Sequence, residues 1–156
     1  MRQPASDLLS HNYGLVAKDL LTPLLDVFAA TRAAFGGDME KAVVLLEVAI
    51  RTLQDPRFPC VDLNTVLRGE MESYPSLSTN MRSIADSSGI PKETVRRKVA
   101  ALVAEGLILR DGNNLSLSTM ASPVVTTVRE AILRLAARNY EAVAALKNRG
   151  TGPPDR

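Results

Sequence analysis

The stretch over residues 78–118 constrains the fold most, because several short elements follow one another there with almost no linker. Residues 78–87 are expected to form a short helix with Ser78 as its N-cap. A tight turn follows at Ser88-Gly89-Ile90. Residues 91–105 then form a longer helix, opened by a proline whose missing N–H costs little at the first helical position.

The segment after this longer helix reads as a β-hairpin. Gly106 ends the helix, and residues 107–110 and 114–118 have the apolar pattern of short strands. Asp111-Gly112-Asn113 between them is a strong hairpin signal. The order helix, turn, helix and hairpin is the plan of a winged helix-turn-helix.

The residues around the turn fit that plan physically. Ala85 is small where the two helices cross, and Gly89 can take the positive φ that a tight turn demands. Val95 anchors the second helix in a small hydrophobic centre. Ile84, Ile90 and Leu102 complete that centre.

Residues 84–99 and 102–108 resemble bacterial winged-helix transcription regulators, with the cyclic-AMP receptor protein and GntR families nearest in pattern. The resemblance covers roughly residues 76–119, less than a third of the chain. In the receptor-protein family, a Ser-Arg-Glu-Thr-Val-x-Arg run begins the helix that reads DNA. The resemblance implies that the helix over 91–105 enters the DNA major groove and that the hairpin over 107–118 is the wing.

The matches to that run lie at Glu93, Thr94, Val95 and Arg97, with Lys92 conservatively placed. The likeness implies that Lys92, Glu93 and Arg97 contact base edges and that Thr94 contacts a phosphate.

Further DNA contacts are expected at both ends of the segment. They are Ser78, Thr79 and Asn80 at the start of the first helix, Arg96 on the second, and Arg110, Asn113 and Asn114 at the hairpin. Each has a plainer interpretation. The basic run can be a solvated helix face, the asparagines can be turn chemistry, and the whole unit can be a trihelical core used for protein contacts.

The segment ahead of the motif departs from both families. It is helical and lacks the Gly-rich strand pattern of a cyclic-nucleotide barrel, whereas GntR proteins place the winged domain first. We therefore expect DNA binding without a cofactor, and the sequence leaves a small-molecule effector open.

The chain is expected to be mostly α-helical with a small β-hairpin wing, flanked by N- and C-terminal dimerisation helices. The predicted parts are a flexible N-terminal tail (1–13), a helical region (14–75), the winged helix-turn-helix (76–119), a C-terminal helix (120–148) and a disordered tail (149–156).

Three helices are expected outside the motif. The first covers residues 15–35, and Thr22-Pro23 either restarts or kinks it. Asp38 caps the second, over 39–54, whose apolar face is expected to comprise Val43, Leu46, Ile50 and Leu53, broadened by Val44, Leu45 and Val48. A short helix over 62–72 turns Leu63, Val66 and Leu67 inward.

The last helix, over 123–147, has an apolar stripe of Val125, Val128, Ile132, Leu135, Ala142 and Leu146. Together with the helix over 39–54 it provides the natural dimer surfaces.

Composition argues against most enzymes. One cysteine, Cys60, excludes an intramolecular disulfide and a cysteine zinc site, and one histidine, His11, removes most histidine-based sites. Both are expected to be passive. We expect no catalytic residues, no metal, no membrane span and, with no export signal, a cytoplasmic protein.

The net charge of +2 hides an uneven distribution. Residues 1–76 have 7 Lys/Arg and 10 Asp/Glu, residues 77–119 have 6 and 4, and residues 120–156 have 6 and 3. Four basic residues of the middle block lie between Lys92 and Lys98. The sequence thus predicts a homodimeric, sequence-specific regulator that binds a palindromic site on double-stranded DNA, and the alternative is a winged-helix adaptor that does not bind DNA.

Overall fold

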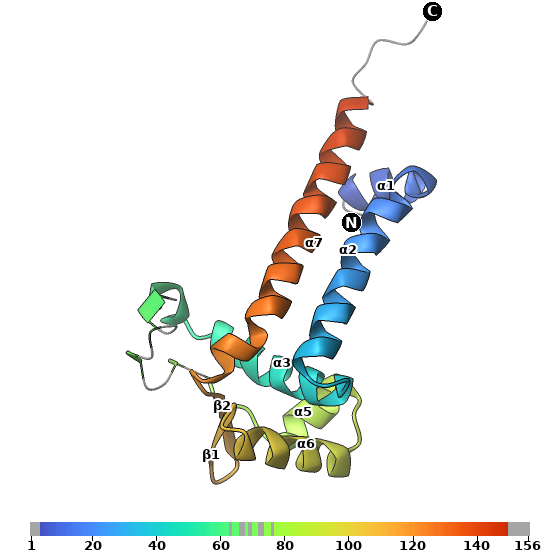
Figure 1. The fold of residues 1–156 in the computed structure, drawn as a ribbon. Helices are drawn as coiled ribbons and strands as arrows, with labels where there is room; N and C mark the ends of the chain where they lie inside the picture. Colours follow the sequence, from blue (N-terminus) through green and yellow to red (C-terminus); the bar gives the residue numbers. More distant parts are fainter. Residues whose placement is uncertain are drawn as a thin grey trace, which may run out of the picture. The chain divides into compact units, whose positions relative to one another are not determined.

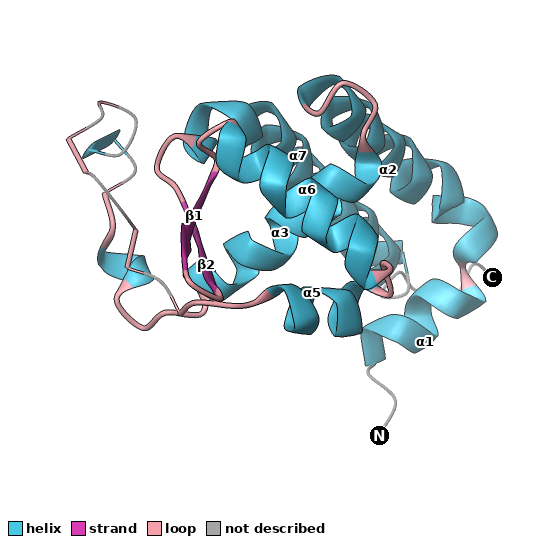
Figure 2. Ribbon diagram, turned by 90° about the horizontal axis from the view of Figure 1, so that it is seen from below, coloured by secondary structure: helices cyan, strands magenta, loops and turns pink. Residues whose placement is uncertain are grey.

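The computed structural model describes residues 4–62, 64–65, 68, 70–71, 74–75 and 77–149. The chain is mostly helical with a small two-stranded antiparallel sheet (Figures 1 and 2). It divides into two compact units, one made of residues 1–30 and 127–156 and the other of residues 31–126. These are called the terminal unit and the central unit below.

The central unit contains the helix pair and the hairpin of the sequence motif together with further elements that precede and follow them. They are α3 (Met39–Leu53), the 3₁₀ turn η1 (Phe58–Cys60), α5 (Met81–Ser88), α6 (Lys92–Ala104), β1 (Ile108–Asp111) and β2 (Asn114–Leu117), followed by the start of α7 (Ala121–Arg149). Their apolar side chains form one core, whose most buried members are Val44, Leu45, Val48, Ile84, Val95, Val99, Leu102, Ile108, Leu115 and Ala121.

The helix α3 begins as predicted but buries a different face. The side chain of Asp38 accepts a hydrogen bond from the N–H of Lys41, which confirms the N-cap. The core side is made by Ala42, Val44, Leu45, Val48 and Thr52. The expectation that Val43, Leu46, Ile50 and Leu53 form the inward face is wrong, because all of them are exposed. Both stripes have helical spacing, and tertiary packing rather than periodicity selects between them.

The start of α5 also corrects the sequence prediction. Asn80, not Ser78, is the N-cap, and its side chain accepts a hydrogen bond from the N–H of Ser83. The two residues ahead of the helix are extended, because Thr79 pairs its backbone with Leu115. The Thr79 N–H donates to the Leu115 carbonyl over 3.0 Å, and the Leu115 N–H donates back over 2.8 Å. This bridge fixes where α5 can begin.

The two turns of the motif are confirmed. Gly89 lies between α5 and α6 with φ of +71°, and its N–H donates to the Ala85 carbonyl. Gly112 has φ of +56° and stands first in the two-residue loop between β1 and β2, a position that favours glycine. The strands pair from Ile108 with Leu117 to Asp111 with Asn114.

In the terminal unit, the helix α1 (Pro4–His11) replaces much of the predicted N-terminal tail. Leu8 and Leu9 pack against a small core of Val16, Ala142 and Leu146, and this burial stabilises a segment whose sequence has little pattern. His11 is exposed, and so is Cys60 in the central unit.

The helix α2 (Tyr13–Ala34) is continuous through Pro23, so a restart at Thr22 is not observed. The stripe predicted for α7 is partly buried. Ala142 and Leu146 are core residues and Val125 packs on the central core, whereas 44% of Ile132 is exposed.

Some predictions cannot be compared. Leu63, Val66 and Leu67 of the helix expected over 62–72, and residues 150–156 of the expected tail, lie outside the described residues. Within the described residues, none of the helices combines the length and apolar character that a membrane crossing requires.

The cap of α5 gives a direct test. Asn80→Ala should lower the free energy of unfolding by about 1 kcal/mol, because the N–H of Ser83 loses its acceptor. Ser78→Ala is the matched control and should leave stability unchanged. Urea unfolding of both variants without DNA measures the difference, and a larger effect at Ser78 would contradict this assignment of the cap.

Candidate nucleic-acid interface

The helix α6 has one face in the core and the opposite face in solvent. Val95, Val99 and Leu102 are buried against the central core. The exposed side carries the predicted contact residues Lys92, Glu93, Arg96 and Arg97, and Thr94 is half-buried. The positive end of the helix dipole adds to the potential near Lys92. The sequence and the structure therefore agree on which surface of α6 is polar.

Glu93 and Arg96 form an ion pair on this surface. The Arg96 Nη2 lies 2.6 Å from the Glu93 Oε1, and its Nε lies 2.9 Å from Oε2. The hydrogen bond from Arg96 lowers the pKa of the Glu93 carboxyl and raises that of the guanidinium. In contrast, Lys92 and Arg97 make no such bond to any other described residue. Among the described residues, the exposed face of α6 thus carries one ion pair and two cations without an ion-pair partner, and the charge of Arg97 also helps to lower the pKa of Glu93.

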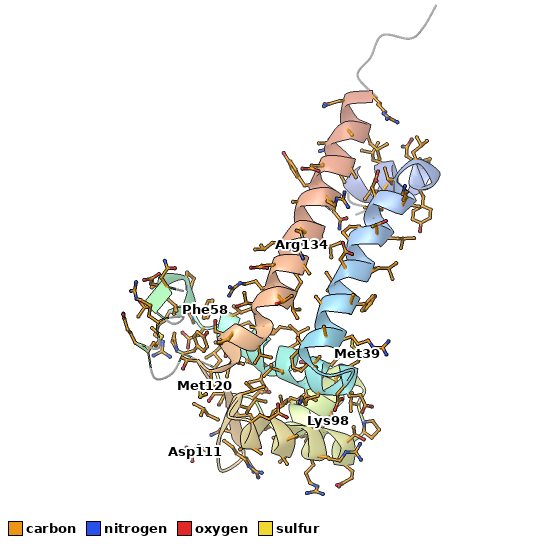
Figure 3. The ribbon with its side chains drawn as sticks, viewed as in Figure 1. Met39, Phe58, Lys98, Asp111, Met120 and Arg134 are labelled. Atoms are coloured by element: carbon orange, nitrogen blue, oxygen red, sulfur yellow. The ribbon has the colours of Figure 1, made fainter. Side chains whose placement is uncertain are left out.

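Lys98 does not belong to this surface, although the basic run predicted by the sequence includes it. Its Nζ hydrogen-bonds to Oδ1 and Oδ2 of Asp38 over 2.8 and 2.7 Å and lies 3.6 Å from Oε2 of Glu40. In Figure 3, Lys98 is labelled below Met39, the first residue of α3. Only 14% of the Lys98 side chain is exposed. The residue faces α3 because it lies between the buried and exposed sides of α6, where the N-terminus of α3 supplies carboxylates.

A second ion pair joins the same two segments. The Lys41 Nζ lies 2.7 Å from Oε1 of Glu105, which follows the last turn of α6. Partial burial acts to raise the pKa of Asp38, but hydrogen bonds from Lys98 and from the N–H of Lys41, together with both positive charges, outweigh it and lower that pKa. Polar contacts thus brace α6 against α3 at two points.

Sequence reasoning missed Arg82. It lies in the first turn of α5, and with Met81, Lys92, Glu93 and Arg96 it lines a cleft of about 240 Å³. The Arg82 side chain is 82% exposed, and its one ion pair with a described residue is a long contact of 3.8 Å from Nε to Oδ2 of Asp86. The available signal was its position shortly after Asn80, the N-cap of α5, at the same end of the motif as the predicted residues Ser78, Thr79 and Asn80.

The hairpin carries the remaining predicted residues. Arg110, Asn113 and Asn114 are all exposed. The Arg110 Nε donates to the carbonyl of Gly112 over 2.9 Å, so its side chain follows the hairpin toward the loop. β1 packs beside α6, which brings this cation into the same unit as those of α6.

The three residues predicted at the start of α5 differ from one another. Ser78 and Asn80 are exposed, and Asn80 uses its side-chain oxygen as a cap. Thr79 is 7% exposed and has its backbone in the bridge to Leu115. The structure therefore does not bring Thr79 to the surface formed by α6.

The described residues of this surface carry mostly charged side chains. Their polar groups are guanidinium, ammonium and carboxylate side chains, and no group of three or more metal-ligating His, Cys, Asp or Glu residues occurs among them. No family model, curated protein or solved structure significantly matches the chain. Its function must therefore be inferred from the shape and charge of this surface.

The contact of Lys98 with Asp38 and Glu40 should contribute to the free energy of unfolding. Lys98→Met should lower the free energy of unfolding by about 1–2 kcal/mol, because Asp38 and Glu40 lose a partly buried counter-ion. Arg97→Ala, on the exposed side, should change it by less than about 0.5 kcal/mol.

The same variant should change the acid limb of the stability curve. Because the pKa of Asp38 is lowered from 3.8, its stabilising contribution is complete above that value and is lost as the pH falls through the folded-state pKa. Lys98→Met should flatten this decline. Unfolding at a series of pH values measures it, and an unchanged acid limb would show that the brace contributes nothing.

Proposed function

We propose that the central unit is a winged helix-turn-helix domain and that the protein is a sequence-specific DNA-binding transcriptional regulator that acts as a homodimer. In this proposal α6 enters the major groove and the β1–β2 hairpin is the wing. The observation that carries it is the exposed polar face of α6, which follows a tight glycine turn and presents the unpaired cations Lys92 and Arg97.

The order of elements supports the winged fold. A helix, α3, precedes the extended bridge at Thr79, and the pair α5–α6 and the hairpin follow. The bridge lies on the β2 side of the hairpin, through Leu115, and so adds a short third strand position to the sheet. This is the sequence of elements typical of winged helix-turn-helix proteins, and the buried residues of α5 and α6 hold the two helices together around Gly89.

The cations of α5, α6 and the hairpin complement the negative charge of a polyanion such as DNA. Lys92, Arg97 and Arg82 lie on α5 and α6, and Arg110 extends the positive charge to the hairpin. Such cations release counter-ions from DNA when they contact phosphates. An arginine that reaches a base edge can donate two hydrogen bonds to guanine, and a carboxylate can accept from cytosine.

Glu93 and Arg96 have linked roles in this proposal. In the free protein they neutralise each other, so they add little to nonspecific attraction. At a matching base pair, Glu93 can accept from cytosine N4 while Arg96 turns to a phosphate. The pair therefore favours sequence discrimination over general affinity.

A homodimer follows from the small number of cations. One domain of this size offers few phosphate contacts, and two copies on a palindromic site double them. Two-fold symmetry of the protein then matches two-fold symmetry of the site.

Arg97 provides the sharpest mutational test. Arg97→Ala should weaken binding to a site selected from random DNA by about 1–3 kcal/mol and relax the preference at one base pair. Arg51→Ala is the matched control, since Arg51 is an exposed arginine of the same unit on α3. If Arg97→Ala leaves affinity and preference unchanged while the fold is intact, α6 does not read DNA.

A salt titration separates the proposal from the adaptor alternative. Binding of a DNA-binding protein should weaken steeply as salt rises, because cations displace condensed counter-ions. Gel shifts of the wild-type protein on random-sequence DNA measure the slope. An absence of binding at every salt concentration would favour a winged-helix adaptor.

A further inference from the structure

The buried and outward sides of α6 are joined by two flanks, and its cations divide between them. At about 100° per residue, Lys98 lies about 70° from the centre of the buried side, on the flank that contacts α3. Lys92 and Arg96 lie about 50° and 90° from that centre in the opposite sense. Both line the cleft toward α5, so this flank presents its charge to a different neighbour.

This α5–α6 cleft gathers positive charge from both helices. Arg82 of α5 and Lys92 and Arg96 of α6 line it, together with Met81 and Glu93. The Arg82 side chain is 82% exposed, and Lys92 has no ion-pair partner among the described residues. Three cations therefore share the cleft with one carboxylate, and an anion that entered it would meet an excess of positive charge.

The cleft has the size and the lining of a site for a phosphate group. Its volume of about 240 Å³ is roughly that of eight water molecules, which leaves room for a phosphate. Met81 packs against the central core, and this contact holds one wall of the cleft in place. Guanidinium groups bind phosphate oxygens through paired N–H donors, and an ammonium group adds charge.

Glu93 competes with such an anion for Arg96. The Nε and Nη2 groups of Arg96 donate to the Glu93 carboxyl over 2.9 and 2.6 Å, and this occupies one edge of the guanidinium. A phosphate binds a guanidinium through the same kind of edge. The side chains of Arg96 and Glu93 are 64% and 76% exposed, so their ion pair is weak enough to exchange.

The position of Glu93 on α6 gives this exchange a consequence. By the same count, Glu93 lies about 150° from the centre of the buried side and Arg97 about 170°, so both point away from the core. Without Arg96, the Glu93 carboxyl is a free acceptor on the side of α6 that enters the groove in the proposed function. A carboxylate in that place can accept from cytosine N4.

We propose that the α5–α6 cleft binds one backbone phosphate of DNA through Arg82, Lys92 and Arg96, and that this contact releases Glu93 to accept from a base. The inference rests on the proposed function and adds a link between anchoring and reading. Arg82 determines sequence preference without touching a base, because it holds the phosphate that draws Arg96 from Glu93. A cation that only attracted DNA would strengthen binding to all sequences equally.

The first test replaces single backbone phosphates by neutral methylphosphonates in a site selected from random DNA. One position should cost the wild type about tenfold in affinity, the loss expected for a hydrogen-bonded contact between charged groups. Arg82→Ala should bind the unmodified site about tenfold more weakly and lose nothing further at that position. Arg51→Ala, an exposed arginine on α3, is the control and should keep the wild-type profile.

The second test measures sequence preference. Glu93→Ala identifies the base pair that Glu93 reads, as the position at which preference is lost. Arg82→Ala should lose most of the preference at that same base pair and keep it elsewhere. The double variant should lose no more preference there than Glu93→Ala alone, because both changes interrupt one chain of contacts. Urea unfolding checks that Arg82→Ala keeps the wild-type stability expected for an exposed residue.

A titration with inorganic phosphate distinguishes the DNA backbone from a free anion as the occupant. Submillimolar binding of inorganic phosphate to the wild type without DNA, lost in Arg82→Ala, would assign the cleft to a free anion and overturn the inference. A methylphosphonate profile that is the same in Arg82→Ala and the wild type would also overturn it. So would a loss of affinity in Arg82→Ala that leaves the preference at the Glu93 base pair intact.

These outcomes are separate from failure of the proposed function. If the wild type does not bind DNA, the proposed function is wrong. If the wild type binds a selected site and Arg97→Ala weakens that binding, whereas Arg82→Ala has the wild-type affinity and preference, the proposed function stands and the phosphate site in the α5–α6 cleft does not.

Discussion

The burial of one face of α6 is the constraint from which the rest of the central unit follows. Val95 and Leu102 are fully enclosed by residues of α3, α5 and the sheet, and Val99 nearly so. Because helix geometry fixes the angle between successive side chains, this burial decides which charged residues of α6 face outward. The turn at Gly89 then sets where the helix begins. The polar surface of α6 is thus a consequence of a hydrophobic contact.

Whether a charged residue of α6 is neutralised depends on the groups near it in space and not on its position in the sequence. Lys98 is neutralised by carboxylates at the start of α3, and Arg96 by Glu93 on its own helix. Lys92 and Arg97 are exposed and have no ion-pair partner among the described residues. In the proposed DNA complex, a surface with few unpaired cations would give a modest electrostatic attraction, so hydrogen-bond geometry would contribute more to discrimination than total charge does.

Local signals were predictable from the sequence, and choices made by tertiary packing were not. Gly89, Gly112 and the Asp38 cap are each dictated by backbone geometry within a few residues, and all three were predicted correctly. The displaced start of α5 comes from pairing with Leu115, far along the chain. The orientation of Lys98 likewise depends on Asp38, 60 residues earlier. No pattern within a single helix contains that information.

The inward face of α3 was predicted wrongly for the same reason, because tertiary packing and not the helical pattern decides which side is buried. α3 carries two apolar stripes on opposite sides of the helix. Only the stripe that faces the central core is buried within one chain. α2 likewise exposes Leu21, Leu24, Leu25 and Phe28. The two cases differ in what surrounds them: α3 belongs to a unit with a large core, whereas α2 belongs to a helix pair with a small one. The deficit of burial is therefore in the terminal unit, whose buried cluster among the described residues is small.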